Sequence, residues 1–295
     1  MWGLTAVIHP VTAESLRSHF YHLGATLSCE LICGQRARIL LNMNTYGRFL
    51  VDGEPRYAEI VGETAHFIAD LFVDRSYTGG SAPWRDLVLL PPVSPRKVFA
   101  IGLNYADHAA ESGQAVPKEP LMWLKSPTAV IAHGATIEIV YPEHRTDYET
   151  ELTIVIGATC KRVSVEEASQ YIFGYTNAQD ISDRVIQRGE SQWTRAKSMD
   201  TYAPLGPFIT TGVEPQSWPV QTFVNGELKQ DSTTDQLIFS VPELVSFLSQ
   251  TITLEAGDVI LTGTPFGVGP LKEGDVVEAR IGPLTPLLNP VRWRS

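Results

Sequence analysis

At 295 residues, the chain is long enough for one large domain or for two domains of unequal size. Apolar residues make up 43% and charged residues 19%, as in ordinary globular proteins, and the 23 glycines and 20 prolines favour a β-rich fold with many turns. The formal net charge of -10 argues against nucleic acid as a partner and fits a protein that binds cations.

The first 92 residues carry no recognisable chemistry, and we expect residues 1–92 to form a small N-terminal domain. Residues 13–23 have helical spacing, and residues 38–41 and 48–51 resemble short strands. The N-terminus lacks the features of a secretory signal, and no stretch of about 18 apolar residues predicts a membrane span. Pro91, Pro92 and Pro95 precede a predicted buried strand at 97–102, so a second domain is predicted over 93–295.

The three cysteines match neither a paired zinc pattern nor a disulfide framework. Cys29, Cys33 and Cys160 are therefore interpreted as buried thiols in a reducing compartment. We accordingly expect a cytoplasmic protein.

In the second part, strand-like runs at 151–156, 220–224, 259–262 and 276–281 are separated by Gly, Pro and Asp turns. Two helices are predicted between them. The first covers 164–171 and opens with a capping box, and the second covers 240–250 with Pro242 near its first turn. This mixture indicates a β-rich α+β domain without internal repeats.

A histidine and a glutamate lie three residues apart in the segment 104–111, Asn-Tyr-Ala-Asp-His-Ala-Ala-Glu. On one helical turn, Glu111 would hold and polarise His108, and the pair would activate a water. The alternative is an ordinary pair on an exposed helix face, where this spacing is frequent. Residues 114–120 are interpreted as a loop.

Acidic residues recur at every second position of the segment 145–157, which then runs into an apolar strand. Because side chains alternate along a strand, Asp147, Glu149 and Glu151 are predicted to point the same way. Like charges on one face repel each other, so we expect something positive between them, and a hard divalent cation is the simplest candidate. The alternative is the solvated face of a half-buried strand.

The segment 175–187 is predicted to open a short helix with three polar side chains on one face. Asp180, Arg184 and Gln187 have the i, i+4 and i+7 spacing that this requires. The alternative is that Asp180 is a helix cap and that Arg184 is a surface cation paired with it.

Lys197 lies between Trp193 and the turn at 204–207, and its charge could hold a carboxylate. The alternative is an ordinary solvated lysine. Further along, the segment 262–269, Thr-Gly-Thr-Pro-Phe-Gly-Val-Gly, breaks a strand into a Gly-rich turn whose backbone donors could cradle an anion. A simple tight connection would use the same glycines, and the pattern is not a phosphate loop.

These motifs occur in the order found in the fumarylacetoacetate hydrolase family, which the chain resembles over about residues 95 to 290. The resemblance implies a distorted β-roll or sandwich with peripheral helices, assembled as a homodimer. It also implies that Glu149, Glu151 and Asp180 chelate a divalent metal. An all-oxygen site suits Mg²⁺ first, and also Mn²⁺ or Ca²⁺, better than zinc.

The resemblance further implies that His108 and Glu111 form a water-activating dyad on a lid. The side chains expected to hold the oxo-acid end of the substrate are Arg184, Gln187, Lys197 and Thr264. The chain departs from the family pattern around this segment, with Gln179 before Asp180 in place of Asn, and with Asp183 and Val185 in place of Ala and Asp. The resemblance therefore predicts the metal site more directly than it predicts the orientation of the substrate.

The expected activity is metal-dependent hydrolysis of a carbon–carbon bond in an acylpyruvate-like 2,4-dioxo acid through a metal-stabilised enolate, with Lys197 adding positive charge. The alternatives are decarboxylation of oxaloacetate and isomerisation or hydration of a related 2-oxo acid. A different class of function is a metal-holding module that senses an oxo acid without turning it over. The complete set of His108, Glu111 and Lys197 argues against a sensor. The expected partner is a small oxo acid, with no nucleic acid and no membrane.

Overall fold

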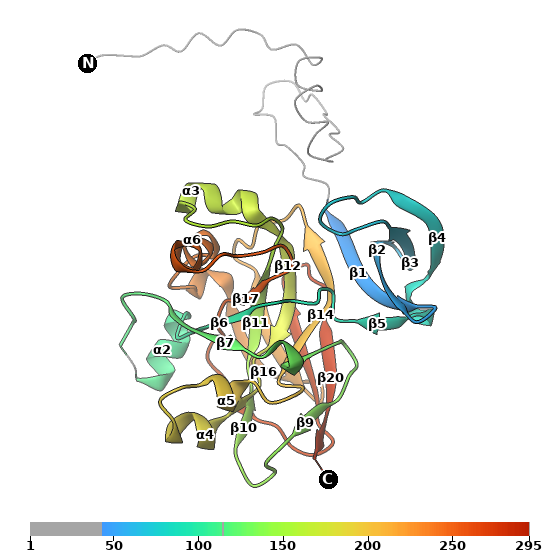
Figure 1. Cartoon of the computed structure of the whole chain (residues 1–295). Coiled ribbons are helices and arrows are strands. Elements are labelled where there is room, and N and C mark those ends of the chain that lie inside the picture. The colour runs from blue at the N-terminus through green and yellow to red at the C-terminus, as the bar shows by residue number, and fades with distance from the viewer. Residues whose placement is uncertain (1–42, 114, 295) are drawn as a thin grey trace, which may run out of the picture. The chain divides into compact units, whose positions relative to one another are not determined.

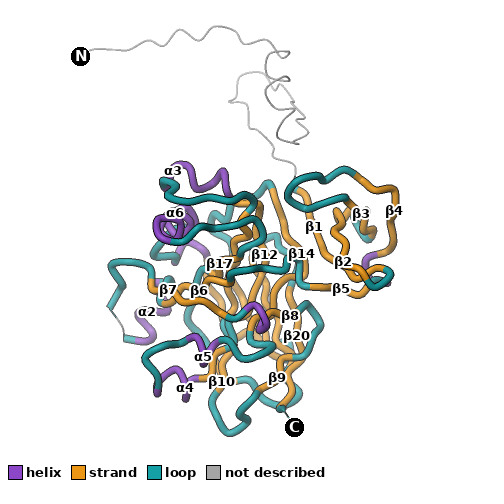
Figure 2. The backbone as a smooth tube through the Cα atoms, in the orientation of Figure 1, coloured by secondary structure: helices purple, strands orange, loops and turns teal. Residues whose placement is uncertain are grey.

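The computed structural model describes residues 43–113 and 115–294, in which strands greatly outnumber helical segments (Figure 1). The predicted helix at 13–23, the predicted strand at 38–41 and two of the cysteines, Cys29 and Cys33, lie outside the described residues. Short helices lie at the periphery of the strands (Figure 2). The predicted β-rich α+β class is confirmed.

The largest sheet of the described residues has 12 strands, in the order β4-β3-β2-β1-β14-β12-β11-β17-β6-β7, with β5 paired to β1 and β8 paired to β14. Its strands are β1 (Asn44–Val51), β2 (Glu54–Val61), β3 (Thr64–Ile68), β4 (Tyr77–Pro83), β5 (Val88–Leu90), β6 (Val98–Gly102), β7 (Leu121–Lys125), β8 (Val130–Ile131), β11 (Thr150–Ile156), β12 (Ile172–Gln179), β14 (Ala203–Thr211) and β17 (Val259–Leu261). Most neighbours are antiparallel, whereas β17 runs parallel to β6 and β8 runs parallel to β14. The predicted strands at 97–102, 151–156 and 259–262 are therefore confirmed as β6, β11 and β17.

Two smaller sheets complete the described strands. A three-stranded sheet contains β10 (Thr146–Tyr148), β13 (Ser182–Asp183) and β18 (Gly269–Pro270). A five-stranded sheet contains β9 (Ile137–Ile139), β15 (Pro219–Val224), β16 (Glu227–Thr233), β19 (Val276–Ile281) and β20 (Leu287–Trp293). Since β15 and β19 contact β11 and β19 also contacts β12, the five-stranded sheet packs against the centre of the largest one.

The described helices are short: α2 (Ala106–Ser112), α3 (Val165–Ala168), α4 (Arg184–Gly189), α5 (Thr194–Lys197) and α6 (Val241–Thr251). The predicted capping box at α3 is present, with Glu167 N donating to Ser164 Oγ and Ser164 N donating to the Glu167 carboxylate. The longest, α6, begins after Ser240 with proline in its first turn, as predicted.

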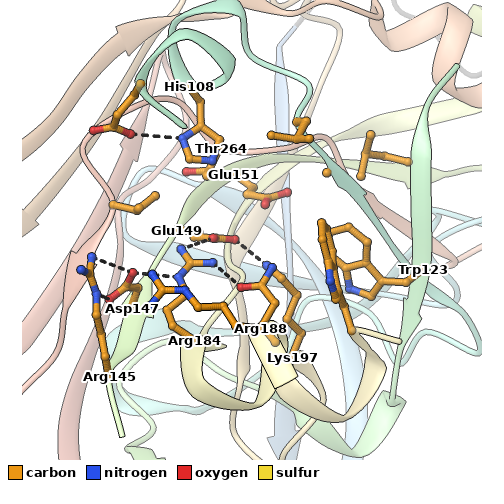
Figure 3. A pocket seen from close by; sticks show the side chains of 17 residues that line it. His108, Trp123, Arg145, Asp147, Glu149, Glu151, Arg184, Arg188, Lys197 and Thr264 are labelled. Atoms are coloured by element: carbon orange, nitrogen blue, oxygen red, sulfur yellow. Dashed lines mark hydrogen bonds and ion pairs between the residues drawn. The ribbon is translucent and has the colours of Figure 1, made fainter. Parts of the chain in front are cut away.

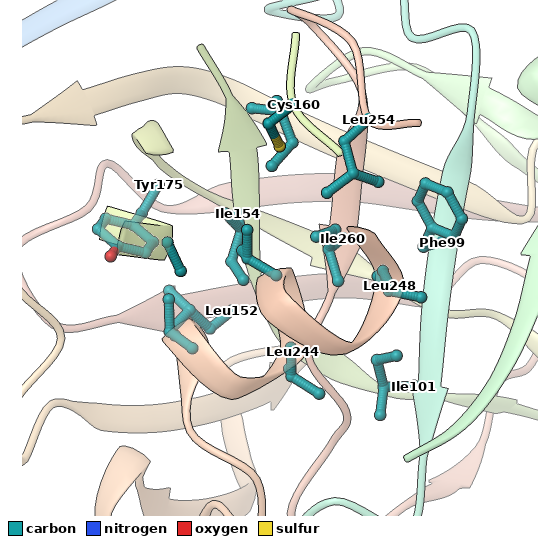
Figure 4. Close-up of a cluster of buried hydrophobic side chains, with 14 of the residues drawn as sticks. Phe99, Ile101, Leu152, Ile154, Cys160, Tyr175, Leu244, Leu248, Leu254 and Ile260 are labelled. Carbon is teal, nitrogen blue, oxygen red and sulfur yellow. The ribbon is translucent and has the colours of Figure 1, made fainter. Parts of the chain in front are cut away.

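The main core lies where α6 covers β6, β11 and β17. Apolar side chains of α6 follow the i, i+3, i+4, i+7 pattern of a helix with one buried face, which is made of Val241, Leu244, Val245 and Leu248. They pack on strand residues that include Leu152, Ile154 and Ile260 (Figure 4). Cys160 is buried in the same cluster, as predicted for a thiol. This packing fixes β11, the strand that continues from the acidic segment.

The strands β1–β5 cover residues 44–90, and the predicted strand at 48–51 is part of β1. β1 is hydrogen-bonded to β14, so these strands extend the largest sheet. The division of the chain near residue 92 stays a prediction. None of the helices in the described part of the chain is long and apolar enough to cross a membrane.

Candidate active site

The acidic segment lies at a junction between two sheets. β10 ends at Tyr148 and β11 begins at Thr150, so Glu149 lies between them. Asp147, Glu149 and Glu151 all line one pocket, whereas the intervening Tyr148 turns away and donates to the Gly267 carbonyl. The alternation predicted from the sequence therefore holds. The three carboxylates are 1%, 4% and 1% exposed, which contradicts the alternative of a solvated strand face.

Asp147 is neutralised by two arginines. Arg145 donates to both of its oxygens at 2.8 and 3.0 Å, and Arg184 Nε donates to Oδ2 at 2.8 Å. Arg184 also donates through Nη2 to Glu149 Oε1 at 2.5 Å. The positive charge between the first two acids of the segment is thus a guanidinium of the chain, and the alternative of Arg184 as a surface cation is wrong.

The other carboxylates form a trio with Asp180, which directly follows β12. Glu149, Glu151 and Asp180 each offer an oxygen, and these oxygens lie within 4.8 Å of one another. The backbone brings them together, because Asp180 N donates to the Glu149 carbonyl at 2.9 Å and Glu151 pairs with Ala178 in the β11–β12 ladder. All three side chains are buried. The spacing of the sequence segments therefore becomes a single cluster of oxygen donors.

Two buried lysines face this trio. Lys197 Nζ lies 2.8 Å from Glu149 Oε2, 2.7 Å from Asp180 Oδ2 and 2.7 Å from Ser182 Oγ. The alternative of a solvated lysine is therefore wrong. Lys125, at the end of β7, donates to Asp180 Oδ1 and to the Tyr202 carbonyl. Sequence reasoning missed Lys125, although a lysine that ends the apolar run Leu-Met-Trp-Leu is a usable signal.

The charges affect the carboxylates unequally. Burial by itself raises the pKa of Glu149, but Lys197 and Arg184 beside it bring that pKa below its ordinary value. Burial, together with the nearby Asp180 and Glu149, raises the pKa of Glu151 well above its ordinary value. Within the described residues Glu151 forms no salt bridge, and Gly263 N donates to its Oε2 at 2.7 Å. Glu151 is therefore the member of the trio with least neutralisation from the chain.

Helix α4 begins later than the sequence indicated. Its first residue is Arg184, and its cap is Asp183, whose Oδ1 accepts from the backbone N–H groups of Val185 and Ile186. Asp180 therefore neither caps the helix nor shares its face, which corrects both interpretations of that residue. Arg184 and Gln187 do lie together, with Nη1 donating to Oε1 at 2.8 Å.

The predicted dyad forms on α2. His108 Nδ1 lies 3.2 Å from Glu111 Oε2, and Gly267 N donates to both oxygens of Glu111 at 3.2 and 3.3 Å. Both residues line the pocket, and their side chains are 17% and 43% exposed, so the pair lies at the rim of the pocket. The imidazole is thus oriented by a carboxylate that the Gly-rich turn also holds.

The Gly-rich turn donates to carboxylates of the site itself. Gly263 N bonds Glu151 and Gly267 N bonds Glu111, so the anions held by this turn are two acidic side chains of the chain. Gly263 has a φ of +99°, and a Cβ there would lie 2.9 Å from Asn104 Cβ. Thr264 is buried and donates to the Thr150 carbonyl at 3.0 Å.

These residues surround a cavity of about 490 Å³ (Figure 3). Eight of the nine predicted site residues line it: His108, Glu111, Glu149, Glu151, Arg184, Gln187, Lys197 and Thr264. The ninth, Asp180, belongs to the carboxylate trio. Sequence reasoning missed four lining residues with large side chains, Trp123, Arg145, Arg188 and Trp193. The two tryptophan rings meet edge to face at 5.1 Å, and Lys197 Nζ lies 4.9 Å from the Trp123 ring.

The trio fits a hard divalent cation on the chemistry of its donors. Its ligand atoms are carboxylate oxygens, as Mg²⁺ and Mn²⁺ prefer, and no sulfur or imidazole from residues 43–113 or 115–294 joins them. A cation would also relieve the repulsion that raises the pKa of Glu151. The residues present therefore could hold such an ion.

Comparisons with known proteins agree with this geometry. Residues 97–292 match the family described as fumarylacetoacetate (FAA) hydrolase C-terminal. An oxaloacetate tautomerase of Bacillus subtilis is 40% identical over 214 residues, which are 68% of this chain and 71% of that protein. The structure of a 5-carboxymethyl-2-hydroxymuconate delta-isomerase from Mycobacterium smegmatis matches with 38% identity and a TM-score of 0.80, over 85% of this chain and 100% of the other. A maleylpyruvate hydrolase structure from Sphingobium matches with 26% identity and a TM-score of 0.70, over 85% and 100%.

Proposed function

Since this chain belongs to the fumarylacetoacetate hydrolase family of enzymes, we propose that it transfers a proton at the carbon beside the ketone of a 2-oxo acid in a reaction that depends on a divalent cation. The main reaction we propose is keto–enol tautomerisation of an oxaloacetate-like acid. The observation that supports it is the position of His108 on the opposite side of the pocket from Arg184 and Lys197, where its imidazole could act as a general base (Figure 3).

The imidazole is set up to accept a proton. When Nδ1 of His108 carries the proton that it donates to Glu111, Nε2 has a free lone pair for the substrate. In the direction from ketone to enol, Nε2 takes a proton from C3, the C–H electron pair forms the C2–C3 double bond, and the ketone oxygen gains negative charge. A proton from solvent water then neutralises that oxygen and completes the enol, and His108 gives the proton it took from C3 back to water. The opposite direction reverses each step.

The other end of the pocket binds the 2-oxo carboxylate. Glu149, Glu151 and Asp180 would hold a divalent cation, which would bind oxygens of the substrate's 2-oxo acid group and supply positive charge to stabilise the ketone oxygen when it becomes negative. Lys197 and Arg184 remain as cations of the chain beside the same oxygens. The positive charges of Lys197 and Arg184 reduce the repulsion between the carboxylate trio and an anionic substrate.

Two relatives support proton transfer. The Bacillus subtilis relative is named an oxaloacetate tautomerase, and the Mycobacterium smegmatis structure is named an isomerase. Both names describe the movement of a double bond, which a single base such as His108 can carry out.

Hydrolysis of an acylpyruvate, the activity expected from the sequence, is the second candidate. The Sphingobium structure named a maleylpyruvate hydrolase favours it, because the same dyad could take a proton from water instead of carbon. That water would attack the distal ketone, and the products would be pyruvate and a carboxylic acid. Decarboxylation of oxaloacetate needs no such base. The homodimer and the cytoplasmic location also remain proposals.

The experiment compares the wild type with H108Q and with H66Q, a control histidine on β3, in Mg²⁺ or Mn²⁺. The assays follow the decay of enol-oxaloacetate, pyruvate release from oxaloacetate and pyruvate release from acylpyruvates. We expect H108Q to lower kcat for tautomerisation roughly 10² to 10⁴-fold, as for a lost general base, while H66Q keeps it. The proposal fails if the wild type does not accelerate tautomerisation, or if H108Q retains full activity.

A further inference from the structure

We propose that Arg188 binds the carboxylate at the far end of a 2-oxo diacid and thereby selects diacids over monoacids. The inference rests on the proposed function, because it names the class of substrate that the same pocket takes.

Four cationic side chains line the cavity, and three of them are committed to acids. These three are Arg145, Arg184 and Lys197, each of which donates to a buried carboxylate. Arg188 is exposed and lines the same cavity, and within the described residues it forms neither a salt bridge nor a hydrogen bond. Its guanidinium therefore keeps its full donor set for a ligand.

The position of Arg188 on α4 places it along the length of a bound substrate. Arg184 and Arg188 are four residues apart, so they share one face of the helix. The Arg184 side chain is 12% exposed and bonds the acids at the bottom of the pocket, whereas Arg188 is exposed. Figure 3 shows Arg188 beside Arg184 and Lys197, on the opposite side of the pocket from His108. Helix α4 thus places the Arg184 guanidinium at the bottom of the pocket and the Arg188 guanidinium nearer the solvent.

The second carboxylate of a diacid needs such a partner. The 2-oxo carboxylate is placed at the trio, where the cations are already present. A distal carboxylate would otherwise enter a cavity whose wall includes Glu111, an acid that no arginine or lysine of the described residues neutralises. A guanidinium binds a carboxylate in a planar two-point contact, so Arg188 supplies both charge and orientation. A monoacid would gain nothing from it.

The test uses two substrates that differ only at the distal group. Oxaloacetate carries a carboxylate where 2-oxobutanoate carries a methyl group, and the exchange of their C3 hydrogens for deuterium reports proton transfer on each. The variants are R188Q, R188K and, as a control arginine outside the pocket, R85Q, in the full chain with Mg²⁺. We expect R188Q to raise KM for oxaloacetate roughly 10 to 100-fold, the range for a lost charged hydrogen bond. The rate with 2-oxobutanoate should not change, and R188K should recover part of the loss.

An equal loss on both substrates, or no loss with oxaloacetate, would overturn the assignment. A second readout separates this inference from the proposed function. Calorimetry with Mg²⁺-loaded protein compares malate with 2-hydroxybutanoate, which need no turnover. If the wild type prefers malate and R188Q does not, Arg188 reads the distal carboxylate even where no exchange is detected. If R188Q keeps the preference for malate, the inference is wrong while the proposed function stands.

Discussion

Replacing Lys197 by Met should destabilise the metal-free protein and make its stability depend on a divalent cation. The Lys197 side chain is 3% exposed, and its ammonium bonds two buried carboxylates at 2.8 and 2.7 Å. Removing one partner of a buried ion pair costs about 3–5 kcal/mol. Arg184 still pairs with Glu149 and Lys125 with Asp180, so we expect the lower end, about 3 kcal/mol.

A cation bound by the same oxygens would replace the missing charge. A ligand that binds the native state adds about 2.7 kcal/mol to the free energy of unfolding when its concentration is 100 times its dissociation constant. K197M should gain more stability from Mn²⁺ than the wild type does, because its carboxylates lack the ammonium. The assay is urea unfolding at pH 7 in EDTA and in Mn²⁺. K97M is the matched control, since Lys97 also bonds two acids, at 2.7 and 2.8 Å, in a part of the chain remote from the trio. Equal gains from Mn²⁺ in K197M and K97M would refute the reasoning.

Two further predictions concern the trio and the Gly-rich turn. Burial and neighbouring carboxylates raise the pKa of Glu151, so the folded state holds the proton of this carboxyl more tightly than the unfolded state does. The free energy of unfolding therefore falls as the pH rises from the ordinary pKa of a glutamate through the raised pKa of Glu151. E151Q should therefore unfold at a higher urea concentration than the wild type at pH 7 in EDTA. It should also lose Mn²⁺ binding in calorimetry. A variant that is less stable than the wild type, or that still binds the metal, would contradict this prediction. Gly267 has a φ of +90°, and a Cβ there would lie 2.6 Å from the Lys229 carbonyl oxygen. G267A must therefore shift the turn and disturb the bond that Gly267 N donates to Glu111. We expect kcat to fall about tenfold or more while Mn²⁺ affinity is retained, because only the orientation of His108 is lost. A wild-type kcat would contradict this.

The common orientation of Asp147 and of the two glutamates of the trio could be predicted, because two independent signals coincide in that segment. The alternation of Asp147, Glu149 and Glu151 places them on one face, and the apolar run after them indicates a buried strand. The start of α4 could not be predicted equally well. Asp180 and Asp183 are both good capping residues, and the choice of Asp183 depends on β13, a two-residue strand that is formed only by pairing with β10.

The cations of the site were harder to predict than its acids. Lys125 lies at the end of an apolar strand, and its partner Asp180 is 55 residues further along the chain. No spacing rule joins such residues, since the β-sheet topology brings them together. The same holds for Trp123 and Trp193, which come from β7 and from the residue before α5 and meet only in the folded pocket.

The junction at Glu149 restricts the length of the chain as well as its chemistry. Upstream of it, Thr146 and Asp147 pair with Asp183 and Ser182, and downstream Thr150 and Glu151 pair with Gln179 and Ala178. Inserting or deleting one residue would turn every following side chain to the opposite face, taking an acid out of the pocket and an apolar group out of the core. Homologues that keep this site should therefore vary in loop length elsewhere and be free of gaps between positions 146 and 151.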